Sequence, residues 1–204
     1  MHDAAVPKSA TPQDAATLNR RAFVSALLAD RGDLLVVSGL GSATYDVAAA
    51  GDHSLNLYQW GGMGGTAMIG LGLAIARPDR RVLVCIGDGD MLMGLGSLAT
   101  IGVKAPKNLS LVVLDNGCYG ETGMQASHTS AGVDLVGVAL SCGFRAAVRV
   151  SSMADAADVR TSVHTGAGPL LVRAVIARDE LPRVLPTRDG HEMRLRFAAV
   201  LSGA

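Results

Sequence analysis

The stretch that decides the fold is RVLVCIGDGDMLMGLGSLATIGVKAPKNLSLVVLDNGC, residues 81–118. Two short apolar runs, Arg81–Ile86 and Leu109–Leu114, flank a segment over Met91–Ile101 whose apolar residues recur at helical spacing. Continuous apolar runs of this length are typical of strands that are buried on both faces of a parallel sheet. A strand, a helix and a second strand in this order predict a βαβ unit, so both strands end at the same edge of the sheet.

The same alternation continues on both sides of this unit. Apolar runs at Leu34–Ser38, Arg145–Val150 and Leu170–Val175 predict further strands. Helical spacing predicts helices over Leu18–Ala29, Met63–Ala76, Val133–Ser141, Met153–His164 and Glu192–Leu201. The fold class that follows is α/β, with a single doubly wound, mostly parallel sheet and helices on both faces. We expect residues 1–16 to form a flexible N-terminal arm and residues 17–204 to form one domain.

Composition and charge exclude several classes of partner. Hydrophobic residues make up 49% and charged residues 18%, which is typical of a globular protein. With 18 basic and 18 acidic residues, the chain gives no electrostatic reason to expect nucleic acid or a membrane surface as partner. The most apolar stretch, Met63–Ala76, is too short and glycine-rich to span a membrane. Cys85, Cys118 and Cys142 match no zinc spacing, and we expect a reducing, cytoplasmic location.

Polar motifs follow the two strands of the central unit. Gly87–Asp90 reads GDGD and Asp115–Cys118 reads DNGC, each directly after an apolar run. Asp88 offers a carboxylate oxygen and Asn116 an amide oxygen, which are the hard ligands that Mg²⁺ prefers. The glycines let the backbone approach a phosphate, and the start of the following helix points free N–H groups at the same place. Together the motifs predict a site for Mg²⁺ and a diphosphate, although Gly-Asp-Gly or Asp-Asn-Gly alone is an ordinary turn.

This pair of motifs resembles the thiamine diphosphate motif of 2-oxoacid decarboxylases and their relatives, in which about 25 residues intervene, as residues 90–114 do here. The upstream sequence WGGMG, residues 60–64, and the small-residue stretch 66–76 resemble the segment that holds the aminopyrimidine in that family. The resemblance continues through YGETGMQ, residues 119–125, and covers about residues 34–175. Within the family, the likeness is greatest to sulfopyruvate decarboxylase β subunits and phosphonopyruvate decarboxylases.

The resemblance implies a role for each matching residue at the diphosphate end. The side chains of Asp88 and Asn116 and the backbone carbonyl of Cys118 would be the Mg²⁺ ligands. The residues implied to contact the cofactor are Gly61, Gly62, Met63, Gly87, Gly89, Asp90, Tyr119 and Gly120. Among them, Met63 would force the two rings of the cofactor into a V shape, and the carbonyl of Gly61 would bind its 4′-amino group.

The resemblance also implies a partner subunit and a class of substrate. In the family, a Glu that contacts the pyrimidine lies on a separate pyrimidine-binding domain, for which the expected single domain leaves no room. We therefore expect a pyrimidine-binding α subunit, an α2β2 assembly and a small 2-oxoacid substrate. On this chain, Glu121, Gln125 and His128 are candidate catalytic residues, and His53 is a weaker candidate for a proton relay.

Two positions depart from the family pattern. Asp90 stands where a Ser or another small residue is common, so it either places a second carboxylate beside the diphosphate or caps the following helix. Glu121 stands where sulfopyruvate-type enzymes carry Ser, and a negative charge there would disfavour a sulfonate or phosphonate substrate.

Two other functions stay open from the sequence. Gly39-Leu40-Gly41 after a strand suggests a nicotinamide oxidoreductase, but Thr44 stands where the third glycine of the dinucleotide fingerprint belongs. A non-catalytic subunit that keeps the fold is the other alternative, against which the intact Asp88 and Asn116 argue.

Overall fold

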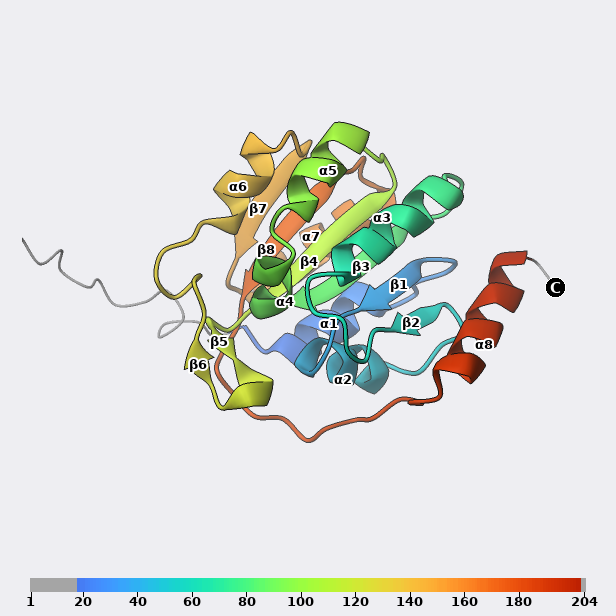
Figure 1. The fold of residues 1–204 in the computed structure, drawn as a ribbon, viewed down its shortest axis with the longest axis horizontal. Helices are drawn as coiled ribbons and strands as arrows, with labels where there is room; N and C mark the ends of the chain where they lie inside the picture. The colour runs from blue at the N-terminus through green and yellow to red at the C-terminus, as the bar shows by residue number, and fades with distance from the viewer. Residues whose placement is uncertain (1–17, 203–204) are drawn as a thin grey trace, which may run out of the picture.

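The computed structural model describes residues 18–202, so the expected N-terminal arm lies outside the described residues. Its main feature is a six-stranded sheet in the order β2-β1-β3-β4-β8-β7, in which every neighbouring pair is parallel (Figure 1). The strands are β1 (Leu35–Ser38), β2 (Asn56–Tyr58), β3 (Val82–Gly87), β4 (Leu109–Asp115), β7 (Ala146–Val150) and β8 (Leu170–Val175). A small antiparallel hairpin of β5 (Cys118–Tyr119) and β6 (Gln125–Ala126) follows β4.

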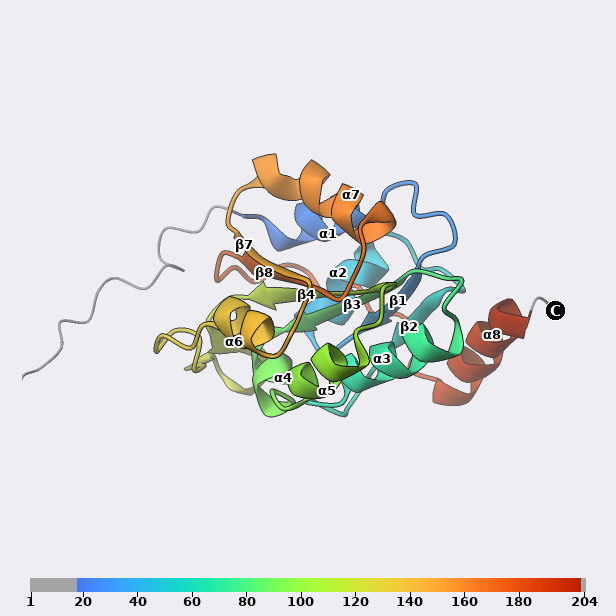
Figure 2. The same ribbon diagram turned by 90° about the horizontal axis from the view of Figure 1, so that it is seen from above.

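Helices cover both faces of this sheet (Figure 2). One face carries α1 (Arg20–Leu28), α2 (Ser42–Ala49) and α7 (Ala156–Thr165). The opposite face carries α3 (Thr66–Ala76), α4 (Asp88–Met93), α5 (Ser97–Lys104) and α6 (Leu135–Ser141). The last helix, α8 (Gly190–Ser202), lies beside β2 at one edge. This layering confirms the predicted doubly wound α/β fold.

Alternation along the buried strands creates two cores. In β4, the side chains of Val112 and Leu114 join the core under α1, α2 and α7, while Leu111 and Val113 join the core under α3 to α6. Successive side chains of a strand point to opposite faces, so a strand covered on both sides must be apolar at every position. All seven residues of β4 are buried, which explains why this strand appears in the sequence as a continuous apolar run.

The order of the strands places a crevice at one edge of the sheet. The chain leaves β1 through α2 to reach β2 on one side, and it returns through α3 to β3 on the other side of β1. The turns that follow β1 and β3 therefore diverge. In open α/β sheets, ligands bind at such a switch point, outside the carboxyl ends of the strands.

Tertiary contacts modify the predicted elements. The helix expected over Met91–Ile101 is two helices, α4 and α5, with a break that begins at Gly94. A Cβ on Gly94 would lie 2.1 Å from the carbonyl oxygen of Gly64, so the chain bends where these two backbones touch. The helix expected from Met63 begins at Thr66, which leaves Met63 in a loop. Among the described residues, no helix is both long and apolar enough to span a membrane.

Two glycines of α3 give a matched test of the packing against the sheet. A Cβ on Gly70 would lie 2.1 Å from Cγ2 of the buried Val84, whereas a Cβ on Gly72 would meet open space. We expect Gly70→Ala to lower the free energy of unfolding by about 1–3 kcal/mol, because β-branched Val84 cannot move aside. Gly72→Ala should instead raise it, by up to about 1 kcal/mol, through helix propensity.

Urea denaturation of the full chain measures both changes. Equal effects of the two substitutions would contradict this packing of α3 on β3.

Candidate functional site

A cleft opens at the carboxyl edge of the sheet. The turns after five strands, β1, β2, β3, β4 and β8, contribute to its lining. Its lining residues are Leu40, Ser42, Ala43, Met63, Gly87, Asp88, Gly89, Asp90, Leu114, Asn116, Cys118, Tyr119, Gly120, Glu121, Thr122 and Ile176. The edge predicted from the sequence is therefore the edge that holds the cleft.

Asp88 lies at the floor of the cleft with its carboxylate 1% exposed. Oδ2 accepts hydrogen bonds from the hydroxyls of Ser127 and Thr129, the latter at 3.1 Å. Both of these side chains bond the same carboxylate oxygen, Oδ2. Burial, and then the charge of Asp115, raise the pKa of Asp88 to about 6. A cation placed here would relieve both effects, because it favours the charged carboxylate.

Asp115 organises the turn from which the other expected ligand projects. Its carboxylate accepts hydrogen bonds from Thr129 Oγ1 at 2.8 Å, from the amide of Gly117 at 2.9 Å and from Arg173 Nε at 2.6 Å. The single hydroxyl hydrogen of Thr129 is thus shared between Asp115 and Asp88, and it joins the two carboxylates. This buried network fixes the orientation of Asp88 from behind, as outer partners do for metal ligands.

The sequence reasoning missed Ser127, Thr129 and Arg173. Arg173 is a charged residue in the middle of the apolar run Leu170–Val175, and a buried charge needs a partner. That pattern could have pointed to Asp115. The two hydroxyls follow no motif in the sequence, and they lie at a turn that follows β6.

Asn116 is held in place by its own turn. Its amide oxygen accepts a hydrogen bond from the amide of Cys118 at 2.9 Å, the pattern of an Asx turn. Gly117, at φ +69°, supplies the left-handed backbone that this turn requires. The turn brings Asn116 and Cys118 to the cleft next to Asp88.

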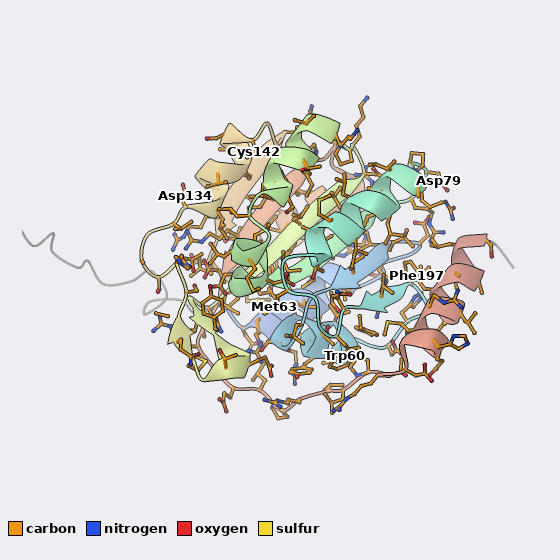
Figure 3. All side chains as sticks on the ribbon, viewed as in Figure 1. Trp60, Met63, Asp79, Asp134, Cys142 and Phe197 are labelled. Atoms are coloured by element: carbon orange, nitrogen blue, oxygen red, sulfur yellow. The ribbon has the colours of Figure 1, made fainter. Side chains whose placement is uncertain are left out.

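Gly87 and Gly89 are glycines for different reasons. A Cβ on Gly87 would meet nothing within 4 Å, so this residue leaves the cleft open. A Cβ on Gly89 would lie 2.7 Å from the ring of Tyr119 and 3.5 Å from Cε of Met63. Both side chains pack directly on the Gly89 backbone. Figure 3 labels Met63 on its loop beside α4.

Asp90 does not cap the helix that follows β3, which corrects one of the two sequence expectations. That helix begins two residues earlier, at Asp88. The Asp90 carboxylate accepts hydrogen bonds from the amide of Gly64 at 2.7 Å and from Thr66 Oγ1 at 2.8 Å. Burial raises its pKa, and these hydrogen bonds oppose that rise. Although Asp90 lines the cleft, one of its oxygens is bonded to the loop that precedes α3 and the other to the first residue of α3.

Glu121 lies at the rim of the cleft, over the N-terminus of α2. Its Oε2 is 3.7 Å from Nη2 of Arg183, and its Oε1 would lie 2.8 Å from a Cβ on Gly41. Burial, and then Glu121, raise the pKa of Tyr45. A carboxylate beside the first turn of a helix is favoured by the exposed N–H groups there. The cleft therefore also borders the N-terminus of α2, a feature that the sequence reasoning missed.

The remaining candidates lie outside the lining of the cleft. Gln125 bonds Thr122 within the hairpin, through its Oε1 and its Nε2, each at 2.8 Å. His128 is exposed, and Gly61 and Gly62 are also absent from the lining. His53 accepts a hydrogen bond from the amide of Leu55 at the start of β2, which is the opposite edge of the sheet.

The donor set suits Mg²⁺ bound together with a diphosphate. It consists of one buried carboxylate, one amide oxygen and backbone carbonyls, all hard oxygens. Among the described residues, no cluster of three or more His, Cys, Asp or Glu side chains could hold a metal alone. A cation here would need further oxygens from a ligand, and Gly87 leaves room for one.

Comparison with known proteins shows the family to which this chain belongs. The family described as thiamine pyrophosphate enzyme, C-terminal TPP binding domain, matches residues 39–174. The chain belongs to this family. It is 39% identical over 211 residues to a phosphonopyruvate decarboxylase of Streptomyces viridochromogenes, covering 96% of this chain and 52% of that protein. It is 43% identical over 172 residues to the sulfopyruvate decarboxylase subunit beta of Methanothermobacter thermautotrophicus, covering 84% and 89%.

A solved relative shows the same fold at low identity. Benzoylformate decarboxylase from Polynucleobacter necessarius superposes with a TM-score of 0.65 at 16% identity, covering 88% of this chain and 36% of that one. The chain spans about half the length of the phosphonopyruvate decarboxylases that it matches. The family membership confirms the resemblance and shows that the nicotinamide alternative is wrong.

The raised pKa of Asp88 predicts a pH dependence of stability in the metal-free chain. A carboxyl whose pKa rises from 3.8 to about 6 on folding binds more protons folded than unfolded between these values. The free energy of unfolding should therefore fall as pH rises from about 4 to about 6, by roughly 2–3 kcal/mol for this group.

Asp88→Asn should remove this fall and make the metal-free chain more stable than the wild type at pH 7. Urea denaturation at pH 4.5 and pH 7 measures the difference between the two proteins. A wild type that gains stability relative to Asp88→Asn as pH rises would show that the carboxylate has a cationic partner in the folded chain.

Proposed function

We propose that this chain is the diphosphate-binding β subunit of a thiamine diphosphate- and Mg²⁺-dependent 2-oxoacid decarboxylase. The observation that carries the proposal is the buried carboxylate of Asp88 at the floor of a cleft that Asn116 and Cys118 also line. The identity to named decarboxylases supports the same activity. The non-catalytic alternative would leave a buried carboxylate with a raised pKa and no task.

Each residue of the site has a distinct task under this proposal. Asp88, Asn116 and the carbonyl of Cys118 hold Mg²⁺, and the backbone at Gly87 and Gly89 lies against the diphosphate. When bound, thiamine diphosphate supplies the electron sink for loss of carbon dioxide from a 2-oxoacid. The chain itself supplies position and charge, through the Ser127 and Thr129 hydroxyls behind Asp88.

A partner subunit completes the site in this proposal. Three described carboxylates line the cleft: Asp88 is bonded to hydroxyls, Asp90 to Gly64 and Thr66, and Glu121 is paired with Arg183. In this proposal Asp88 holds the cation and the other two carboxylates are bonded to side chains or backbone of this chain, so the acid that contacts the pyrimidine comes from elsewhere. Relatives named as β subunits support a pyrimidine-binding α subunit, for which α2β2 is the simplest assembly. The cytoplasmic location expected from the sequence stays a prediction.

Calorimetric titration of thiamine diphosphate tests the function, with the full chain alone and mixed with the candidate α subunit. We expect binding that requires Mg²⁺ and is weakened more than about 100-fold by Asp88→Ala. Thr129→Val, which removes an outer partner of Asp88, should weaken it about tenfold.

Thr161→Val is the control, because this hydroxyl bonds only a backbone carbonyl within the exposed part of α7, and the affinity should not change. Absence of binding to both the chain and the mixture would refute the cofactor assignment.

Glu121 directs the choice among 2-oxoacids in our proposal. Its carboxylate places a negative charge at the rim, partly offset by Arg183. We therefore propose a substrate whose side group is uncharged, in contrast to the phosphonate and sulfonate named for the relatives. Glu121→Gln removes the charge and leaves Arg183 free to attract an anionic side group.

With the α subunit present, Glu121→Gln should raise kcat/KM for phosphonopyruvate roughly three- to tenfold relative to kcat/KM for pyruvate. Arg183→Gln is the opposite control and should lower the same ratio. Release of carbon dioxide from each substrate gives the measurement, and a ratio that neither substitution moves would exclude Glu121 from substrate selection.

A further inference from the structure

Three turns at the carboxyl edge meet at the carboxylate of Asp90. From the turn after β3, its Oδ1 reaches the amide of Gly64 at 2.7 Å and its Oδ2 reaches Thr66 Oγ1 at 2.8 Å. From the turn after β1, Gly39 approaches so closely that a Cβ there would lie 2.3 Å from Oδ2. The side chain is only 5% exposed, so these contacts replace water around the carboxylate.

Backbone packing at the other end of α4 fixes the same loop. Gly64 has φ +86°, and a Cβ on it would lie 3.1 Å from the amide of Gly94. The amide of Gly94 in turn donates to the carbonyl of Asp90 at 3.2 Å. Gly64 is therefore held at two points of one short helix, by the Asp90 carboxylate and by the backbone at Gly94. Only the contact with Asp90 is made by a side chain, so a substitution can remove it without creating a backbone clash.

Met63 immediately precedes Gly64, so whatever fixes Gly64 also fixes Met63. Its Cε packs against Gly89, one residue before Asp90. Met side chains are flexible and have no preferred place of their own. The position of Met63 in the cleft must therefore come from its backbone.

We propose that Asp90 is a positioning residue. Its carboxylate attaches the loop that carries Met63 to the turn after β3, and this attachment places Met63 against the cofactor. This inference rests on the proposed function and adds a task for a residue that the family resemblance assigned to the diphosphate itself. Because both carboxylate oxygens are committed to Gly64 and Thr66, Asp90 acts through Met63. Its negative charge is tolerated beside an anionic cofactor because hydrogen bonds to the loop hold it.

Two measurements on the full chain test this inference. The first is hydrogen exchange of the Gly64 amide without cofactor, which reports directly on the bond to Asp90. Asp90→Ala should speed this exchange about tenfold or more. Asp90→Asn should keep it within about threefold, because its carbonyl can accept from Gly64 while its amide group donates to Thr66.

The second measurement is the Kd for thiamine diphosphate with Mg²⁺, in a double-mutant cycle with Met63→Ala. Asp90→Ala alone should weaken binding about tenfold. In the Met63→Ala background it should weaken binding less than about threefold, because the contact between Met63 and the cofactor is already lost. Asp134→Ala is the matched control: Asp134 also accepts a backbone N–H, from Val136 at 3.1 Å, but on the exposed start of α6. It should leave the Kd unchanged.

The outcomes separate this inference from the proposed function. Tighter binding by Asp90→Asn than by the wild type would overturn the inference and show direct repulsion of the diphosphate. Independent effects of Asp90→Ala and Met63→Ala would also overturn it. If Asp90→Ala does not fold, Thr66→Val, which removes one bond only, replaces it in the cycle. A wild type that binds no cofactor refutes the proposed function instead. The exchange measurement needs no cofactor, so an unchanged exchange rate at Gly64 in Asp90→Ala would still overturn the attachment of the loop to Asp90.

Discussion

The buried carboxylate of Asp115 is the constraint on which both the sheet and the site depend. It lies at the end of the central strand β4 with no exposure to solvent, where an uncompensated charge would cost several kcal/mol. Arg173 from the neighbouring strand β8 compensates it at 2.6 Å, and the amide of Gly117 and the hydroxyl of Thr129 add hydrogen bonds. The first contact joins two strands, the second shapes the turn that presents Asn116, and the third leads to Asp88. A substitution at Asp115 would therefore disturb the fold and the proposed cation site together, and the two effects cannot be separated at this position.

The crevice itself follows from the strand order, and its chemistry follows from close approaches within it. Divergence of the turns after β1 and β3 opens the edge of the sheet, and glycines let the remaining turns converge on it. Gly89 accepts Tyr119 and Met63 on its backbone, and Gly64 and Gly94 bring two loops into contact. The site is thus assembled from turns that follow five different strands, and no single segment of the chain could form it alone.

The sequence predicted the parts of this structure that depend on local pattern. Buried strands such as β4 show as continuous apolar runs, and the polar residues directly after β3 and β4 had to meet because parallel strands share an edge. The short α2 and β2 were not predicted, because β2 has only three residues and α2 buries polar residues such as Thr44 and Asp46. The hydrogen-bond partners of Asp90 could not be predicted, because Thr66 and Gly64 lie 24 and 26 residues away in the sequence. For the same reason no motif revealed Thr129, which is 41 residues from Asp88.

Under the proposed function, charge balance at the floor of the cleft would link the binding of the cation to that of the diphosphate. Arg173 neutralises Asp115, but among the described residues the side chains that bond the carboxylate of Asp88 are the uncharged hydroxyls of Ser127 and Thr129. An anionic diphosphate entering alone would meet this carboxylate, with Glu121 at the rim, and would be repelled. A divalent cation entering alone would find one carboxylate, one amide oxygen and carbonyls, which is too few ligands for tight binding. When the two bind together, the phosphate oxygens would supply the missing ligands of the cation, and the cation would screen the charge of Asp88 from the phosphate. Cation and cofactor should therefore bind cooperatively, and the buried, partly uncompensated carboxylate is the physical cause.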